Sequence, residues 1–196
     1  MKKRKINIPL LLAVVLVAAL IGVTGYSQIK SRLALRRAHD LVAQLQQLMP
    51  ETHKGTWDDR TNMAMPVLQV DQENLCALLE IPAFDVRLPV NSTWKNRDLS
   101  SRPCRYHGSI YDGSLIIGGS DRKGQFDFCD RIDTGNVVIV TDMTGAQYTY
   151  SVVIVERYTE MNPQILTESE YDLTLYMRTD RKTEYLVVRC DMKGSV

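Results

Sequence analysis

The N-terminal apolar segment constrains this chain more than any other feature. No charged side chain occurs from Ile6 to Gln28, and residues 10–23 consist almost entirely of Leu, Val, Ile and Ala. The run approaches the roughly 20 residues that a helix needs to cross a bilayer. We therefore predict a transmembrane anchor over residues 6–28, which leaves the rest of the chain to fold at one face of a membrane.

Basic residues on both sides of this segment bear on its orientation. Four occupy the tail of residues 1–5, which the positive-inside rule holds in the cytoplasm, whereas four more at positions 30, 32, 36 and 37 favour the opposite orientation. A cleaved signal peptide is the alternative, but residues 22–26 form a poor small-x-small cleavage site and the apolar run is long for such a peptide. We expect a single-pass protein of the cell membrane with a cytoplasmic tail and an extracytoplasmic C-terminal domain.

The segment after the predicted anchor has the composition of a helix. Residues 29–49 contain no Gly or Pro, and Leu41, Leu45 and Met49 recur at steps of four. We predict a helical stalk over 29–49, which is either a plain spacer or packs its apolar stripe on the domain or on a partner helix. The polar, turn-rich residues 50–65 indicate a linker.

From Pro66 the pattern changes to short β-branched and aromatic runs separated by turn signals, which is typical of a mostly β domain. The expected strands are Leu75–Ile81, Val86–Val90, Ser114–Ile117, Asn136–Asp142, Gln147–Glu156, Tyr171–Met177 and Glu184–Cys190. We predict a closed β-barrel of about seven or eight strands with short helices over residues 66–196.

Charge and cysteine spacing narrow the function classes. The net charge is +1 with acids and bases nearly balanced, so the whole chain offers no electrostatic argument for nucleic acid. The four cysteines form no C-x-x-C pair and no cluster of zinc spacing, so we expect neither a metal site nor a cofactor. Outside the cytoplasm they could pair in any of three ways, or they could be four small buried hydrophobes.

Several strings resemble bacterial sortases when taken in order. They are LEIPAFDVRLPV at 79–90, Trp94, PCRYxGSxY at 103–111, LIIGG at 115–119, Phe126, GNVV at 135–138, GxxYxYxV at 145–152, DLTL at 172–175 and VRC at 188–190. The resemblance covers roughly Cys76 to Met192. It implies a membrane-anchored cysteine transpeptidase of Gram-positive bacteria, which cleaves an LPxTG-type sorting signal and joins the protein to peptidoglycan or to a pilin.

The same resemblance implies three catalytic side chains: a Cys thiolate that attacks the Thr carbonyl, a His that protonates the leaving amine, and an Arg that holds the oxyanion. The position of the His falls on Ser120, that of the Cys on Arg178 and that of the Arg on Tyr185. A guanidinium has no lone pair to offer, so Arg178 cannot act as the nucleophile. Ser120 needs a neighbouring base, and no sequence feature places a histidine beside it.

Cys190 lies five residues beyond Tyr185 on the same predicted strand, about 16 Å along it, so it is too distant to replace the lost nucleophile. We therefore hypothesise a sortase-like pseudoenzyme that binds a sorting-signal peptide, a pilin or an active sortase at Ser120, Arg178 and Tyr185. Arg178 would attract an acidic side chain or a C-terminal carboxylate, unless the groove is simply unused. The alternatives are an active transpeptidase or hydrolase with a relocated nucleophile, Ser120 or a cysteine, and a purely structural surface protein with a filled groove.

Overall fold

The computed structural model describes residues 16, 33, 36–56, 63–95, 99, 102–122, 124–179 and 184–193. Apart from Leu16, the predicted anchor lies outside the described residues, as does the basic tail. In the part of the chain that is described, no helix is both long enough and apolar enough to cross a membrane.

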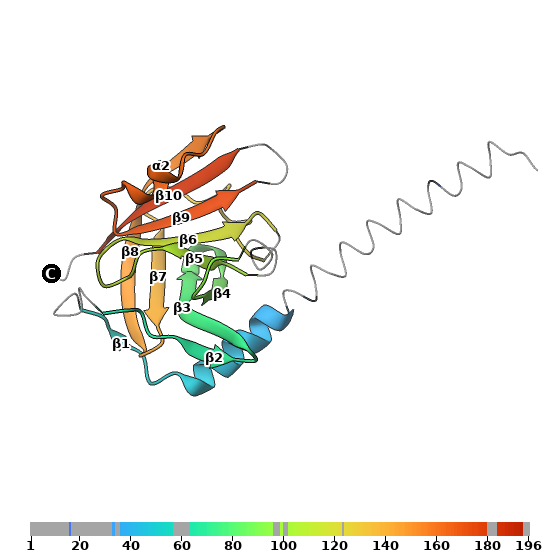
Figure 1. Ribbon diagram of the computed structural model, residues 1–196, viewed down its shortest axis with the longest axis vertical. Helices are drawn as coiled ribbons and strands as arrows, with labels where there is room; N and C mark the ends of the chain where they lie inside the picture. The colour runs from blue at the N-terminus through green and yellow to red at the C-terminus, as the bar shows by residue number, and fades with distance from the viewer. Residues whose placement is uncertain are drawn as a thin grey trace, which may run out of the picture.

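Eight strands close into a barrel (Figure 1). They are β3 (Glu73–Ile81), β4 (Val86–Asn91), β5 (Cys104–His107), β6 (Leu115–Ser120), β7 (Val137–Asp142), β8 (Ala146–Tyr158), β9 (Leu173–Arg178) and β10 (Tyr185–Met192). Hydrogen-bonded neighbours follow the order β8, β10, β9, β6, β5, β4, β3 and β7, and β7 pairs with β8 to complete the ring. The predicted mostly β closed barrel is confirmed.

Two further strands extend the ring at its margins. β2 (Leu68–Val70) pairs with the start of β3, and β1 (His53–Lys54) pairs in parallel with the start of β8. β1 falls within the segment that we predicted as a linker. Residues 53–54 of that segment are therefore part of the sheet, because they pair with β8. Neither of these strands nor β5 was predicted, because two to four residues carry too little periodicity to be recognised.

The barrel interior follows from the alternation of side chains along each strand. Ile117 on β6, Leu175 on β9 and Val188 on β10 occupy one continuous row of register partners, and all three are buried in the main core. Along each strand, the residues directly before and after these three point to the outer face of the barrel wall. The core therefore assigns every neighbouring side chain of these strands to one face or the other.

Residues 36–48 form a helix that packs against the barrel rather than standing away from it (Figure 1). Leu41, Val42 and Leu45 are buried in a second apolar cluster with residues of β2, β3 and the β7–β8 turn: Val70, Leu75, Leu78 and Met143. The apolar stripe predicted for the stalk thus finds its partner on the domain itself.

Two short helices complete the described structure. η1 (Pro82–Phe84) links β3 to β4, and α2 (Pro163–Thr167) precedes β9. Asn162 caps α2 by accepting a hydrogen bond from the Gln164 N–H. Leu166 of α2 packs with Ile116 and Val187, which holds the helix on the outer face of β6 and β10.

The docked helix leads to a stability prediction. Because Leu45 is fully buried, Leu45→Ala should lower the free energy of unfolding by about 2–5 kcal/mol in a urea titration of the full-length protein in detergent. The control is Leu48→Ala on the same helix, where 58% of the side chain is exposed and the change should stay within about 0.5 kcal/mol. Equal effects of the two substitutions would show that the helix is not part of the folded domain.

Candidate functional site

The three positions singled out in the sequence lie side by side on adjacent strands. Ser120 ends β6, Arg178 ends β9 and Tyr185 begins β10. Ser120 and Arg178 are register partners in the parallel β6–β9 pair, and Arg178 and Tyr185 are partners in the antiparallel β9–β10 pair. Neighbouring strands lie about 4.8 Å apart, so the three backbones form one row at one end of the barrel.

The row belongs to the outer face of the wall. Met177 and Leu186, the neighbours of Arg178 and Tyr185 along the chain, are buried in the core, so Arg178 and Tyr185 point the other way. Arg178 is exposed, and Ser120 and Tyr185 are half-buried. The Arg178 guanidinium forms no ion pair with any residue that the structure describes, so its charge is available at the surface.

Ser120 is held in place without being activated. Its hydroxyl donates a hydrogen bond of 2.9 Å to the side-chain carbonyl oxygen of Gln125, and its backbone carbonyl accepts from the Phe126 N–H. Gln125 is buried and orients the hydroxyl. A neutral amide cannot take the serine proton, because it is not a base of useful strength. This arrangement therefore lacks the base that a serine nucleophile requires.

The histidines lie away from this row. His107 ends β5 opposite Ile116, which is four residues, or about 13 Å along β6, from Ser120. His53 is on β1 beside Ala146, where its ring contacts the carbonyl of Glu51, and His39 is on the N-terminal helix. The structure brings Ser120, Arg178 and Tyr185 together but places no histidine among them.

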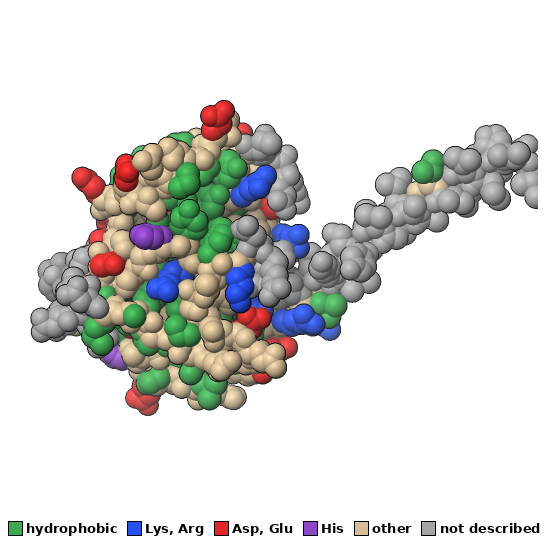
Figure 2. All heavy atoms as spheres, viewed as in Figure 1, with side chains coloured by type: hydrophobic (Ala, Val, Ile, Leu, Met, Phe, Trp, Pro, Cys, Tyr) green, Lys and Arg blue, Asp and Glu red, His purple; other side chains and the backbone are tan. Residues whose placement is uncertain are grey.

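A patch of aromatic rings adjoins the row on the same face and includes Tyr185 itself, and we call it the aromatic floor. Its members are Trp94, Tyr106, Tyr176 and Tyr185. The Tyr176 and Tyr185 rings stack with centroids 6.1 Å apart and 10° between planes, and Trp94 meets Tyr106 edge to face at 4.9 Å. Figure 2 shows this apolar area over β6, β9 and β10 with basic side chains at its margin. Aromatic residues beside an arginine are typical of binding hot spots.

Two features adapt the strands to the aromatic floor. Gly118 on β6 leaves room for Trp94, since a Cβ at this position would lie 2.3 Å from the indole ring. Burial, with the neighbouring Tyr185, raises the pKa of Tyr176 to about 12, so its hydroxyl stays protonated at neutral pH. We did not predict the floor, although Tyr176 and Tyr185 fall at outward-facing positions of their predicted strands, and this pattern could have indicated it.

The cysteines, all within the described ranges, are buried and no disulfide joins them. Burial raises the pKa of Cys76 to about 12, and it raises the pKa of Cys129 and of Cys190 as well. A thiol with a raised pKa is a poor nucleophile at neutral pH, because the thiolate is the reactive form. Among the described residues, no group of His, Cys, Asp and Glu side chains is arranged to hold a metal ion.

A buried arginine supports the outer wall farther along the same strands, four residues from the row on both β9 and β10. The Arg189 side chain on β10 donates to Glu156 on β8 and to Thr174 on β9, each at 3.1 Å, and to the carbonyl oxygen of Ile165 in α2. One guanidinium thus ties two strands and a helix together. This network fixes the relative positions of β9 and β10, which carry Arg178 and Tyr185.

Solved structures of sortases share this architecture. Sortase A from Corynebacterium diphtheriae superposes with a TM-score of 0.54 at 15% identity, over 85% of each chain. Sortase C-1 from Actinomyces oris gives 0.52 at 19% identity, over 61% of this chain and 73% of that one. The sortase D5 transpeptidase of Clostridium perfringens gives 0.53 at 15% identity, over 61% and 79%. No family model and no curated protein matches the sequence. The chain therefore has the sortase fold.

The close approach of Gly118 and Trp94 can be tested by substitution. Gly118→Ala should displace the indole and lower the free energy of unfolding by about 1–3 kcal/mol, with a loss of near-ultraviolet circular dichroism. In the Trp94→Leu background the same change should cost little, because the clash is gone, and a double-mutant cycle measures this coupling. Additive effects of the two substitutions would contradict the contact.

Proposed function

We propose that this protein is a sortase-fold pseudoenzyme of the cell surface, which binds a carboxylate-bearing peptide on the outer barrel wall without cleaving it. The observation that carries the proposal is the row of Ser120, Arg178 and Tyr185 on three adjacent strands, with the exposed arginine at its centre. In the sequence resemblance, these are the positions of the histidine, the cysteine and the arginine of a transpeptidase.

The chemistry of the three side chains supports the loss of catalysis. A guanidinium stays protonated and offers no lone pair, so Arg178 cannot form the acyl intermediate that a thiolate forms. Ser120 donates to an amide carbonyl and has no histidine partner. Tyr185 can donate one hydrogen bond, but it carries no positive charge to stabilise an oxyanion. The nucleophilic and acid–base steps of the transpeptidase reaction thus lack the groups that would perform them.

The same side chains are suited to binding. A guanidinium can hold a carboxylate with two parallel hydrogen bonds, which makes Arg178 the anchor for an acidic side chain or a chain terminus. The neighbouring Tyr176 and Tyr185 rings are already stacked, so they offer apolar area to the adjoining peptide at little entropic cost. Candidate ligands are a sorting-signal peptide, a segment of a pilin and an acidic segment of an active sortase.

The proposed site of action follows from the sequence alone. An anchor over residues 6–28 with a cytoplasmic tail would hold the barrel at the outer face of the cell membrane, where secreted proteins emerge. Protease added to cells whose wall has been removed should digest the C-terminal domain if it lies outside the membrane. Survival of the domain in these cells, together with digestion after they are lysed, would place the domain inside.

An active enzyme with a relocated nucleophile is the rival proposal. It requires a histidine within hydrogen-bond reach of Ser120 or of a thiol. The geometry around Ser120 and the raised pKa values of Cys76, Cys129 and Cys190 weigh against it. A structural surface protein is the second rival, and it predicts that the aromatic floor binds no peptide.

Binding is best tested with matched peptides and the full-length protein in detergent. A labelled peptide with a free C-terminal carboxylate should bind about tenfold more tightly than the same peptide with a C-terminal amide, as measured by fluorescence anisotropy. Arg178→Gln should remove this preference and Arg178→Lys should restore part of it. The control is Arg36→Gln on the N-terminal helix, which should leave the preference unchanged.

Catalysis is tested separately by chromatography of an LPxTG-type peptide incubated with the protein and an amine acceptor. We expect no cleavage and no transfer, before or after alkylation of the thiols. Cleavage that alkylation or a Cys→Ala change abolishes would establish the rival enzyme instead.

In the binding test, equal affinity for the carboxylate and amide peptides, or no binding of either, would remove the proposed role of Arg178.

A further inference from the structure

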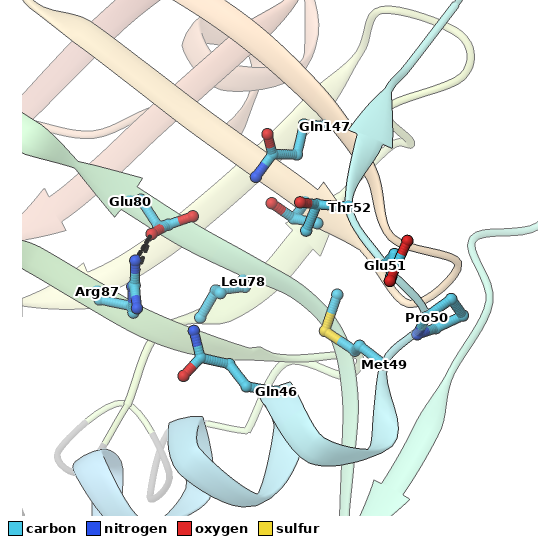
Figure 3. Close-up of a pocket in the computed structure, with 10 residues that line it drawn as sticks. Gln46, Met49, Pro50, Glu51, Thr52, Leu78, Glu80, Arg87 and Gln147 are labelled. Carbon is cyan, nitrogen blue, oxygen red and sulfur yellow. Dashed lines mark hydrogen bonds and ion pairs between the residues drawn. The ribbon is translucent and has the colours of Figure 1, made fainter.

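A hollow lies on the opposite wall of the barrel, between the N-terminal helix and strands β3, β4, β7 and β8 (Figure 3). In the ring of eight strands, β3 stands four places from β9, so this hollow is diametrically opposite the row that contains Arg178. Its volume is about 590 Å³. Small-molecule sites in proteins usually enclose about 300–1,000 Å³, so the hollow is large enough for a ligand.

The floor of the hollow is built by register. Leu78 on β3 pairs with Thr141 on β7, and Thr141 pairs with Gln147 on β8, so the three lie in one row across the sheet. Their chain neighbours Leu79, Val140 and Tyr148 are buried in the core, so the row itself faces outward. The walls come from the end of the helix and the chain after it, through Gln46, Met49 and Thr52.

Polar groups converge on this space from separate elements. One carboxylate oxygen of Glu80 on β3 accepts a hydrogen bond of 2.6 Å from the Arg87 guanidinium. The other oxygen points into the hollow toward Gln147 (Figure 3). The amides of Gln46 and Gln147 and the hydroxyl of Thr52 also line it. The lining therefore offers both donors and acceptors, and the charges of Glu80 and Arg87 largely cancel.

A buried hydroxyl without a partner is the second observation. Thr141 lines the hollow and is only 1% exposed, yet its hydroxyl oxygen makes no hydrogen bond to any residue that the structure describes. An unpaired buried hydroxyl lowers stability, so its presence calls for an explanation, and binding of a ligand is one. The hydroxyl oxygen is itself buried, so a ligand on the floor would contact it only after the Thr141 side chain changes rotamer.

We propose that this hollow binds a neutral saccharide. A sugar ring presents hydroxyl groups that both donate and accept, which matches Glu80, Gln147 and Thr141. It also presents apolar C–H faces, which match Leu78 and Met49. An anion is disfavoured, because Glu80 already neutralises Arg87 and Glu51 adds a negative charge at the rim.

An extended peptide fits this wall less well. Peptide strands bind by adding to an unpaired sheet edge. Along the floor, β3 is paired with both β4 and β7, and β7 is paired with both β3 and β8. In the described part of the chain, β3 and β7 therefore offer no open backbone edge along the floor, so recognition there falls to the side chains that converge on a compact space.

The test uses the full-length protein in a zwitterionic detergent, since detergents with sugar headgroups would compete. The probes are cellobiose and N,N′-diacetylchitobiose, titrated by calorimetry and by chemical-shift changes in nuclear magnetic resonance. At least one should bind saturably. Thr141→Val, which keeps the shape but removes the hydroxyl, should weaken that binding about fivefold to tenfold, and Thr141→Ser should retain it.

Stability separates a functional hydroxyl from a structural one. Because the Thr141 hydroxyl has no hydrogen-bond partner among the described residues, Thr141→Val should leave the unfolding midpoint unchanged or raise it while binding weakens. The control is Thr149→Val on β8, which removes a hydroxyl outside the hollow and should change neither affinity nor midpoint. Arg178→Gln should also leave saccharide binding intact, which keeps this proposal independent of the peptide site.

Three results would overturn the proposal. They are the absence of saturable binding by either disaccharide, binding that Thr141→Val does not affect, and a Thr141→Val protein that is destabilised as if a structural hydrogen bond had been removed. A peptide whose binding depends on Thr141 but not on Arg178 would assign the hollow to a peptide instead of a saccharide.

Discussion

The parallel pairing of β6 with β9 is the constraint on which this structure depends. Parallel strands cannot be joined by a tight turn, so the chain between Ser120 and Leu173 must cross from one end of the pair to the other. It does so through β7, β8 and α2, and the pairing of β7 with both β3 and β8 closes the ring. The same in-register pair sets Ser120 beside Arg178. One arrangement of backbone hydrogen bonds thus produces both the barrel and the row on its outer wall.

On the outer wall, the sheet fixes where the side chains lie, and the residue types decide what those side chains can do. Its strands bring three side chains together with the regularity of a sheet, whichever residue types occupy those places. With Arg178, Ser120 and Tyr185 present, the wall offers a fixed positive charge, an oriented hydroxyl and an aromatic ring stacked on Tyr176. These groups are suited to recognising a partner rather than to transforming it, because Arg178 has no lone pair to offer and the Ser120 hydroxyl donates to an amide instead of a base.

The sequence predicted the barrel well, because long strands reveal their alternation locally. Short strands such as β5 were missed, since Cys104–His107 contains two basic residues and makes sense only between its neighbours. The docking of residues 36–48 was left open, because the stripe that includes Leu41 and Leu45 suits a domain and a partner helix equally. The row of Ser120, Arg178 and Tyr185 was found through resemblance. The aromatic floor and the hollow beside Thr141 were not found, because both arise from lateral pairing between strands distant in the chain.

The docked helix also sets how far the domain can range. From residue 36 onward the chain moves with the barrel, because Leu41, Val42 and Leu45 fasten it there. If residues 6–28 span the membrane, only the seven residues 29–35 remain between bilayer and barrel, and even a fully extended chain of that length reaches about 25 Å. The barrel would then stay close to the lipid surface. A partner would then meet the barrel close to the membrane, and for a partner that is itself anchored, two-dimensional diffusion in the bilayer would govern how often the two meet.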